Sequence, residues 1–371
     1  DKNIVEELVK LFKLKEYSQL ENKIHELINI YPKNIFLRNI LGLSYANQDK
    51  LDKAEKIFLD ILLINSKHEE SCNNLGLVYQ KQNKLEDAIK YYNLAIENNP
   101  NFVEAIFNLG NAFRENRNLK DCIDMYLRAI EINPVYLKSY INLGNVYEEK
   151  NDYDLALKTY YSGLEKIPNC SDLFFCLGNI FQKQKKYEES IREYNNAIKN
   201  NPRNFQGYFA LGNVYVKIGN LDKALGFYTT AISYNPKYED SYINLALVLQ
   251  ELGKFDESLL NLNKSFSINK KKPEILNYIG NVFLKLRKYD EAILSYKKAI
   301  LLNENYADAY NHLAIAYLEK DNFNEAINNS LIAFKLEPSL GSALSRYWHV
   351  KRICCDWSDD TDLYEDISTH I

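Results

Sequence analysis

The chain repeats one pattern of apolar and polar positions every 34 residues. Most units carry apolar or small residues at positions 4, 7, 8 and 11, and again at positions 20, 24 and 27. Spacings of three and four place each set on one stripe of a helix, so every unit is predicted to form two helices that pack through these stripes. The units begin at Asp1, Ile35, Glu69, Val103, Leu137, Ser171, Phe205, Glu239, Pro273 and Ala307.

Small residues mark the expected close approach of the two helices. Position 8 holds Gly42, Gly76, Gly110, Gly144, Gly178, Gly212, Ala246, Gly280 and Ala314 in successive units. A glycine inside a helix costs roughly 1 kcal/mol relative to alanine, so close packing must offset this cost. Aromatic residues at positions 11 and 24 are expected to fill the groove between the helices. Proline at position 32 closes many units, because it cannot continue the second helix.

This pattern resembles the tetratricopeptide repeat, a helix-turn-helix unit of 34 residues. The resemblance implies an all-α fold, a right-handed superhelical solenoid in which ten repeats cover residues 1–340. Trp348 would fall at the small position 8 of an eleventh unit and would push a partner helix away. Residues 341–371 are therefore expected to form a C-terminal helical segment, with one helix, a break, and an acidic helix that begins at Ser358 or Asp359.

Composition narrows the classes of function. The formal net charge is -4, so the chain has no basic excess that would hold nucleic acid or an anionic membrane. No apolar stretch is long enough to span a membrane. The six cysteines form no CxxC pair and are interpreted as small apolar residues in a reducing compartment, so we expect a cytoplasmic or nuclear protein. Since the chain begins at Asp1 and has one methionine, we expect it to be part of a longer protein.

Catalytic chemistry is not indicated by the sequence. Seven of the thirteen glycines lie at position 8 of the helix pairs, and none of the thirteen forms a phosphate-binding loop after a strand. The five histidines are scattered over the chain without metal-ligand or catalytic spacing. We therefore predict no catalytic residue, no metal site and no cofactor within these residues, and expect the function to lie on a surface.

Asparagines recur on the first helices, which line the concave side of such stacks. They occupy positions 6 and 9, three apart and hence on one helix face. This asparagine ladder consists of Asn74, Asn108, Asn142 and Asn244 at position 6, and Asn111, Asn145, Asn179, Asn213 and Asn281 at position 9. A carboxamide offers a donor and an acceptor, so the ladder could hold the backbone of extended polypeptide segments. Alternatively, these asparagines tie adjacent helices together, and the sequence leaves both interpretations open.

Acidic residues at position 2 lie one turn before the ladder. They include Glu70, Glu104, Asp172, Asp240 and Asp308. These carboxylates could select ligands that carry Lys or Arg. They could equally favour the positive end of the helix dipole, because each lies in the first turn of its helix.

The residues after the repeats carry a second resemblance. The segment Cys355-Asp356-Trp357-Ser358-Asp359, which follows a long repeat array with an asparagine ladder, resembles the junction of the protein O-GlcNAc transferases. This resemblance implies that the ladder and the position 2 acids hold protein substrates, that a catalytic region using UDP-GlcNAc follows residue 371, and that the repeats can dimerise through their convex face. The ladder departs from the family pattern at Ile40, Cys176, Ala210, Tyr278 and His312.

Two alternatives remain at this point. The chain could be an interaction scaffold with no enzyme attached, or the repeat domain of a Spindly-type O-fucosyltransferase. In the first, partner binding would be the whole function. The second shares the repeat array, but we do not expect the Cys-Asp-Trp junction in that family.

Overall fold

All regular structure in the described part of the chain is helical. The computed structural model describes residues 2–354, in which helices follow one another without a strand, so the predicted all-α array of tandem helix pairs is confirmed. The first helices of the pairs are α1 Lys2–Lys13, α3 Ile35–Asn47, α5 Glu69–Lys81, α7 Val103–Glu115, α9 Leu137–Glu149, α11 Ser171–Lys183, α13 Phe205–Lys217, α15 Glu239–Glu251, α17 Pro273–Lys285 and α19 Ala307–Leu318. The second helices are α2 Tyr17–Ile30, α4 Leu51–Ile64, α6 Leu85–Asn98, α8 Leu119–Ile132, α10 Tyr153–Lys166, α12 Tyr187–Asn200, α14 Leu221–Tyr234, α16 Phe255–Ile268, α18 Tyr289–Leu302 and α20 Phe323–Leu336.

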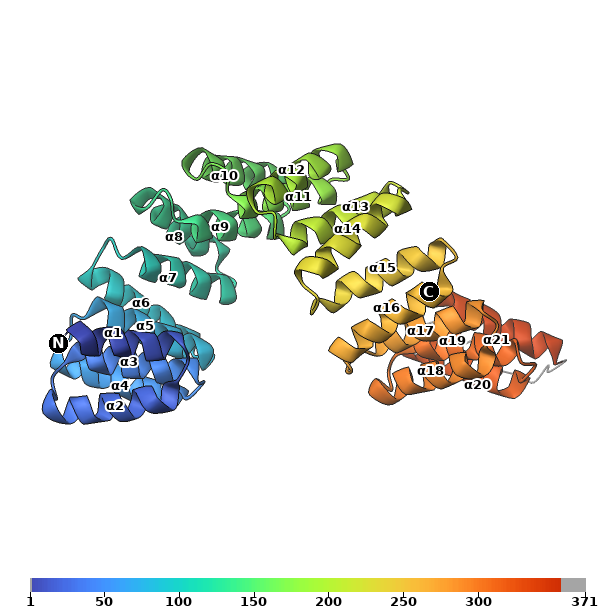
Figure 1. Cartoon of the computed structure of the whole chain (residues 1–371), viewed down its shortest axis with the longest axis horizontal. Helices are drawn as coiled ribbons and strands as arrows, with labels where there is room; N and C mark the ends of the chain where they lie inside the picture. The colour runs from blue at the N-terminus through green and yellow to red at the C-terminus, as the bar shows by residue number, and fades with distance from the viewer. Residues whose placement is uncertain (1, 355–371) are drawn as a thin grey trace. The chain divides into compact units, whose positions relative to one another are not determined.

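The chain divides into two compact units, residues 1–180 (unit 1) and residues 181–371 (unit 2). Figure 1 shows that within each unit the helices lie side by side in chain order, and neighbouring helices pack against one another. Such a stack has no single central core. Instead, layers of buried side chains lie between neighbouring helices.

Glycine at position 8 gives space to an aromatic ring from position 24 of the same repeat. A β-carbon placed on Gly76 would lie 2.6 Å from the Tyr92 ring, and one on Gly110 would lie 2.7 Å from the Tyr126 ring. In two repeats where position 24 is aliphatic rather than aromatic, position 8 is larger than glycine. The eighth repeat combines Ala246 with Leu262, and the first repeat combines Leu8 with Ile24. The volumes at the two positions are therefore complementary from repeat to repeat.

Every first helix ends in the same left-handed turn at position 15. The residues with positive φ at this position are Lys15, Asp49, Asn83, Arg117, Asn151, Lys185, Gly219, Gly253, Arg287 and Asp321. The next residue donates its N–H to the carbonyl of position 11, as Lys50 does to Tyr45 at 2.9 Å. This is the Schellman arrangement that closes a helix and reverses the chain.

The last described helix, α21 (Gly341–Ile353), keeps the register of a further first helix and packs against α20. Ala343 and Tyr347 are buried with Ala333 and Phe334 of α20, and Trp348 packs beside them. The acidic helix expected after Ser358 lies outside the described residues.

Candidate functional site

The asparagine ladder lies on the first helices, and all nine of its side chains are half-buried rather than fully exposed. The position 2 acids lie in the first turns of their helices. Glu70, Glu104 and Asp172 are exposed, whereas Asp240 and Asp308 are half-buried. The spacing predicted that these residues share one face. Because the ladder side chains are half-buried, they are part of the packing between helices and not an open row of amides.

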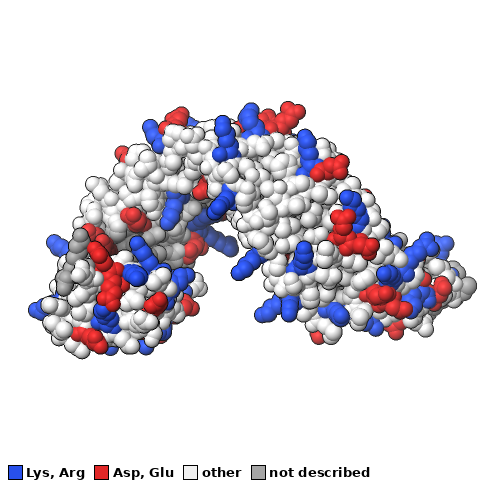
Figure 2. All heavy atoms as spheres, viewed as in Figure 1, with Lys and Arg blue, Asp and Glu red and all other residues white. Residues whose placement is uncertain are grey.

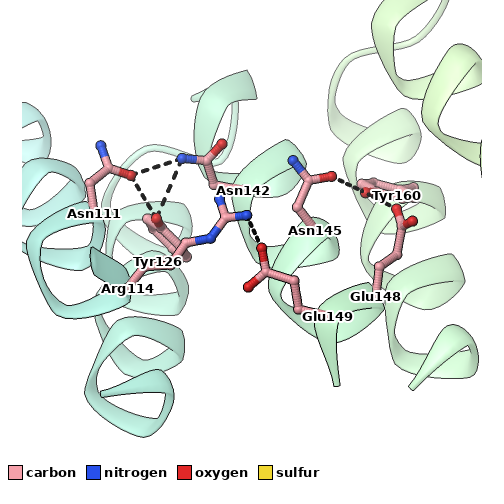
Figure 3. Close-up of polar contacts among 8 residues, drawn as sticks. All are labelled: Asn111, Arg114, Tyr126, Asn142, Asn145, Glu148, Glu149 and Tyr160. Carbon is pink, nitrogen blue, oxygen red and sulfur yellow. Dashed lines mark hydrogen bonds and ion pairs between the residues drawn. The ribbon is translucent and has the colours of Figure 1, made fainter. Parts of the chain in front are cut away.

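A hydrogen-bonded group of three residues joins the fourth and fifth repeats. Asn111 Oδ1 accepts from the Asn142 side chain at 2.8 Å and from the Tyr126 hydroxyl at 2.6 Å, and Asn142 Nδ2 also lies 3.4 Å from that hydroxyl (Figure 3). We call Asn111, Tyr126 and Asn142 the unit 1 rung. It links position 9 of one repeat, position 24 of its second helix and position 6 of the next repeat.

The same group recurs three repeats later as the unit 2 rung, formed by Asn213, Tyr228 and Asn244. Asn213 Oδ1 accepts from Tyr228 at 2.7 Å and from Asn244 at 2.9 Å. The tyrosines are buried, and burial raises the pKa of the Tyr126 and Tyr228 hydroxyls above the ordinary value. Both hydroxyls therefore stay protonated and serve as donors.

Other ladder residues share parts of this arrangement. Tyr160 donates to Asn145 at 3.0 Å, and Tyr296 donates to Asn281 at 2.8 Å. Asn108 and Asn74 instead donate to position 5 asparagines of the preceding repeat, Asn73 at 2.9 Å and Asn39 at 3.0 Å. Asn179 lies half-buried on α11. The bonds between repeats support the interpretation that these amides tie adjacent helices.

Each rung also leaves one donor and one acceptor free of partners among the described residues. Asn111 uses its carbonyl in the rung, and Asn142 uses its amino group. Figure 3 shows that the Asn111 Nδ2 and the Asn142 Oδ1 point away from the shared bonds and toward the same side. Structural ties and ligand recognition are therefore compatible, because they use different atoms of the same side chains.

One departure from the ladder pattern introduces a titratable group. His312 takes the place of asparagine at position 6, its Nδ1 lies 3.1 Å from Asn277 Oδ1, and its ring stacks on Tyr296. Burial holds the pKa of His312 below its usual value, so the neutral ring replaces the neutral amide.

The position 2 acids are less uniform than the amides. Asp240 forms an ion pair with Lys272 at 2.6 Å, and Glu70 accepts from Asn39 at 3.5 Å. These two carboxylates are therefore partly satisfied within the protein. Figure 2 shows acidic and basic side chains interspersed on the visible face.

Sequence reasoning missed three kinds of residue in this site. The buried position 24 tyrosines were assigned to the core alone, yet their hydroxyls reach the ladder. Asn39 and Asn73 at position 5 were not counted, although asparagine one residue before the ladder position was a visible signal. The pairs formed at positions 12 and 13 were not predicted either: Arg114 of α7 pairs with Glu149 of α9, and Gln80 donates to Glu115.

Residues 2–354 contain no group of three or more His, Cys, Asp or Glu side chains placed to hold a metal ion. No described helix is long and apolar enough to cross a membrane.

Comparison with known proteins identifies the repeats. Models described as the tetratricopeptide repeat match residues 69–102, 91–124, 125–158 and 239–272, and a model described as the TPR repeat matches residues 178–219, 212–253 and 280–321. Together these matches cover more than half of the chain. No curated protein matches the sequence.

Solved structures resemble the chain at low identity. Yeast Tom70 is 12% identical, covers 98% of each chain and has a TM-score of 0.49. The pilF protein of Pseudomonas aeruginosa is 19% identical, covers 56% of this chain and 95% of its own, and also has a TM-score of 0.49. YrrB, a TPR protein with an unusual peptide-binding site, is 23% identical over 48% of this chain and 92% of its own, with a TM-score of 0.37. At identities and TM-scores this low, the likenesses carry no argument about function.

The repeat models, the period of the sequence and the helix pairs agree over the residues that the models match. Repeats of this kind mediate interactions between proteins. The chain therefore belongs to the tetratricopeptide-repeat proteins.

Proposed function

We propose that the chain binds extended polypeptide segments through the outward amide groups of its asparagine ladder. The observation that supports this proposal is that each rung uses some of its amide atoms for bonds within the protein and leaves others for a ligand. One amide group is fixed by the Tyr126 hydroxyl and by its partner amide, and the atoms left over are a donor on Asn111 and an acceptor on Asn142. Preorganised groups lose little entropy when a ligand binds.

A donor and an acceptor side by side match the peptide group of a ligand. The Asn111 amino group would donate to a backbone carbonyl, and the Asn142 carbonyl would accept from a backbone N–H. Such contacts recognise the extended backbone and depend little on the ligand's side chains. The position 2 acids would add a preference for segments that carry Lys or Arg.

We further propose that these repeats recruit substrates for a protein O-GlcNAc transferase of the cytoplasm and nucleus. The Cys355-Asp356-Trp357 junction motif, which lies outside the described residues, and the ladder support this proposal. A catalytic region of the whole protein would bind UDP-GlcNAc and modify Ser or Thr of the recruited protein. The convex face of the repeats would serve as a homodimer contact.

Backbone binding is tested by fluorescence anisotropy with unrelated unstructured peptides. Asn142→Ala and Asn244→Ala each remove an outward acceptor, yet leave each tyrosine hydroxyl bonded to its position 9 asparagine. Each change should weaken the binding of all the peptides to a similar extent, by roughly 0.5 to 1.5 kcal/mol per lost hydrogen bond. Asn195→Ala, an exposed change on α12, is the matched control and should have no effect. Unchanged affinity in both ladder variants would remove the proposal.

The transferase assignment is tested by competition. The chain is added to an active O-GlcNAc transferase, and glycosylation of unfolded protein substrates is compared with that of a short acceptor peptide. The chain should slow the protein reaction by sequestering substrates, and the Asn142→Ala/Asn244→Ala double variant should slow it less. The reaction of the short peptide, which can reach one rung at most, should be slowed least. If neither reaction is slowed although the chain binds unrelated peptides, the scaffold alternative is correct.

A further inference from the structure

Two pockets on the first helices occupy the same place in the repeat, three repeats apart. The unit 1 pocket has a volume of about 400 Å³ and is lined by Gln80, Asn111, Arg114, Glu115 and Glu149. The unit 2 pocket has a volume of about 370 Å³ and is lined by Gln182, Asn213, Val216, Lys217, Tyr228, Asn244, Leu247, Val248 and Glu251. Each residue of the unit 1 pocket has its equivalent in the unit 2 pocket, so the two differ in side chains rather than in location within the repeat.

The unit 1 pocket is polar throughout. Arg114 forms an ion pair with Glu149 of the following repeat, and Gln80 donates to Glu115 in the same way. These partners satisfy one another across the pocket next to the unit 1 rung. These residues offer an apolar ligand side chain only the aliphatic stems of polar side chains.

In the unit 2 pocket, apolar residues replace part of this polar network. Val216 stands where unit 1 has Arg114, and Leu247 stands at position 9, where unit 1 has Asn145. Val248 lies beneath them and is 3% exposed. Val216 and Leu247 remain half-buried, so their side chains still offer surface to a ligand beside the unit 2 rung.

We propose that the unit 2 pocket binds an aliphatic side chain, such as leucine, isoleucine or methionine, of the polypeptide whose backbone the unit 2 rung holds. This inference rests on the proposed function and adds side-chain selectivity to it. Burying an aliphatic group against Val216 and Leu247 removes apolar surface from water on both sides of the contact. A polar side chain in the same place would lose water without gaining a partner from these residues.

Charged residues at the rim of the unit 2 pocket predict which residues of the bound polypeptide lie on either side of its aliphatic residue. Lys217 and Glu251 occupy position 13 of consecutive repeats, are exposed, and form no ion pair with any described residue. The axes of packed helices lie about 8 to 10 Å apart in general, and an extended chain rises about 3.3 Å per residue. The favoured segment therefore carries an acidic residue near Lys217 and a basic residue about three positions away near Glu251, with the aliphatic residue between them.

The probe is a pair of fluorescein-labelled peptides of twelve residues. Both consist of serine, threonine and glycine around a central glutamate and lysine three positions apart; the first peptide has leucine between these charges, and the second has serine. The wild-type chain should bind the leucine peptide about tenfold more tightly. Val216→Arg/Leu247→Asn, which introduces the residues that unit 1 has at these two positions, should reduce this preference to less than twofold.

These substitutions are designed to preserve folding. Asparagine already occupies position 9 in five repeats, and the arginine introduced by Val216→Arg would face Glu251 as Arg114 faces Glu149. The single change Leu247→Asn provides a milder variant that should lose part of the preference. Arg114→Val/Asn145→Leu is the reciprocal change and should raise affinity for the leucine peptide.

The outcomes separate this inference from the proposed function. If both peptides bind equally and both are weakened by Asn244→Ala, backbone binding stands and the aliphatic pocket is wrong. If the wild-type chain binds neither peptide, both proposals fail. A leucine preference that survives Val216→Arg/Leu247→Asn would also overturn the inference, because the preference would then arise elsewhere.

Discussion

At the scale of single residues, the site depends on pairs that the sequence separates by about half a repeat. The position 24 ring can reach the ladder only because the first helix has no β-carbon at position 8, as Gly110 and Tyr126 show. Gly110 costs helix propensity, but it also makes room for the Tyr126 ring, whose hydroxyl donor then lies beside Asn111. Packing and recognition are thus joined in one side chain.

Gly219 and Gly226 allow the effect of backbone conformation on stability to be tested without a steric clash. Gly219 has φ +77° and Gly226 lies within α14, and a β-carbon at either would meet nothing within 4 Å. Gly219→Ala should destabilise the protein by about 1 to 2 kcal/mol, because the left-handed conformation disfavours a β-carbon. Gly226→Ala should stabilise it by about 0.5 to 1 kcal/mol through helix propensity. Urea denaturation measures both, and the same sign for the two changes would contradict this explanation.

Much of the residue-level site was visible in the sequence. The spacing of Asn108, Asn111, Asn142 and Asn145 predicted that these amides share one helix face, and in the structure each is half-buried on a first helix. The direction of each amide could not be predicted, because it depends on a bond between repeats, such as Asn142 to Asn111, and on a hydroxyl arriving from another helix. A period in the sequence fixes which positions recur, but not which atoms face each other.

At the scale of elements, the helix pair is the unit that the sequence specifies best. Small residues at position 8 and aromatic residues at position 24 predicted the close packing that is observed. The turns were less visible, because only Gly219 and Gly253 mark position 15 with glycine while eight other residue positions adopt the same positive φ. The turns after the second helices also rely on asparagine: Asn99 Oδ1 accepts from the N–H of Asn101 at 3.2 Å, an Asx turn that position-by-position hydrophobicity cannot show.

The complementarity of positions 8 and 24 predicts coupling between two substitutions. Gly144→Ala would drive a β-carbon into the Tyr160 ring and should cost about 1 to 3 kcal/mol. Gly144→Ala/Tyr160→Leu copies the Ala246 and Leu262 pair of the eighth repeat, so the clash disappears. The double variant should be more stable than the sum of the single changes by about 1 kcal/mol or more. Thermal or urea unfolding of the four proteins gives this interaction energy, and strict additivity would contradict the proposed complementarity.

At the scale of the whole molecule, each repeat is stabilised by its neighbours, so the effect of an altered repeat stays local. This organisation allows the two rungs to keep one backbone-binding geometry while the side chains around them differ. It also means that stability is not uniform along the chain.

The first repeat should be the least protected of the described pairs. Leu8 and Leu20 occupy positions that later repeats give to glycine and alanine, and α1 and α2 share much less contact than α5 and α6. Because α1 and α2 pack less closely against each other, their amide hydrogens should exchange at least about tenfold faster than those of α5 and α6, which corresponds to ~1.4 kcal/mol. Hydrogen exchange followed by mass spectrometry of peptides from α1, α2, α5 and α6 measures this difference. Leu20→Ala should accelerate exchange in α1 and α2 while leaving α9 and α10 unchanged, as local stabilisation requires. Equal protection of the first and third repeats, or acceleration that spreads through the chain, would show that the array opens as one cooperative body.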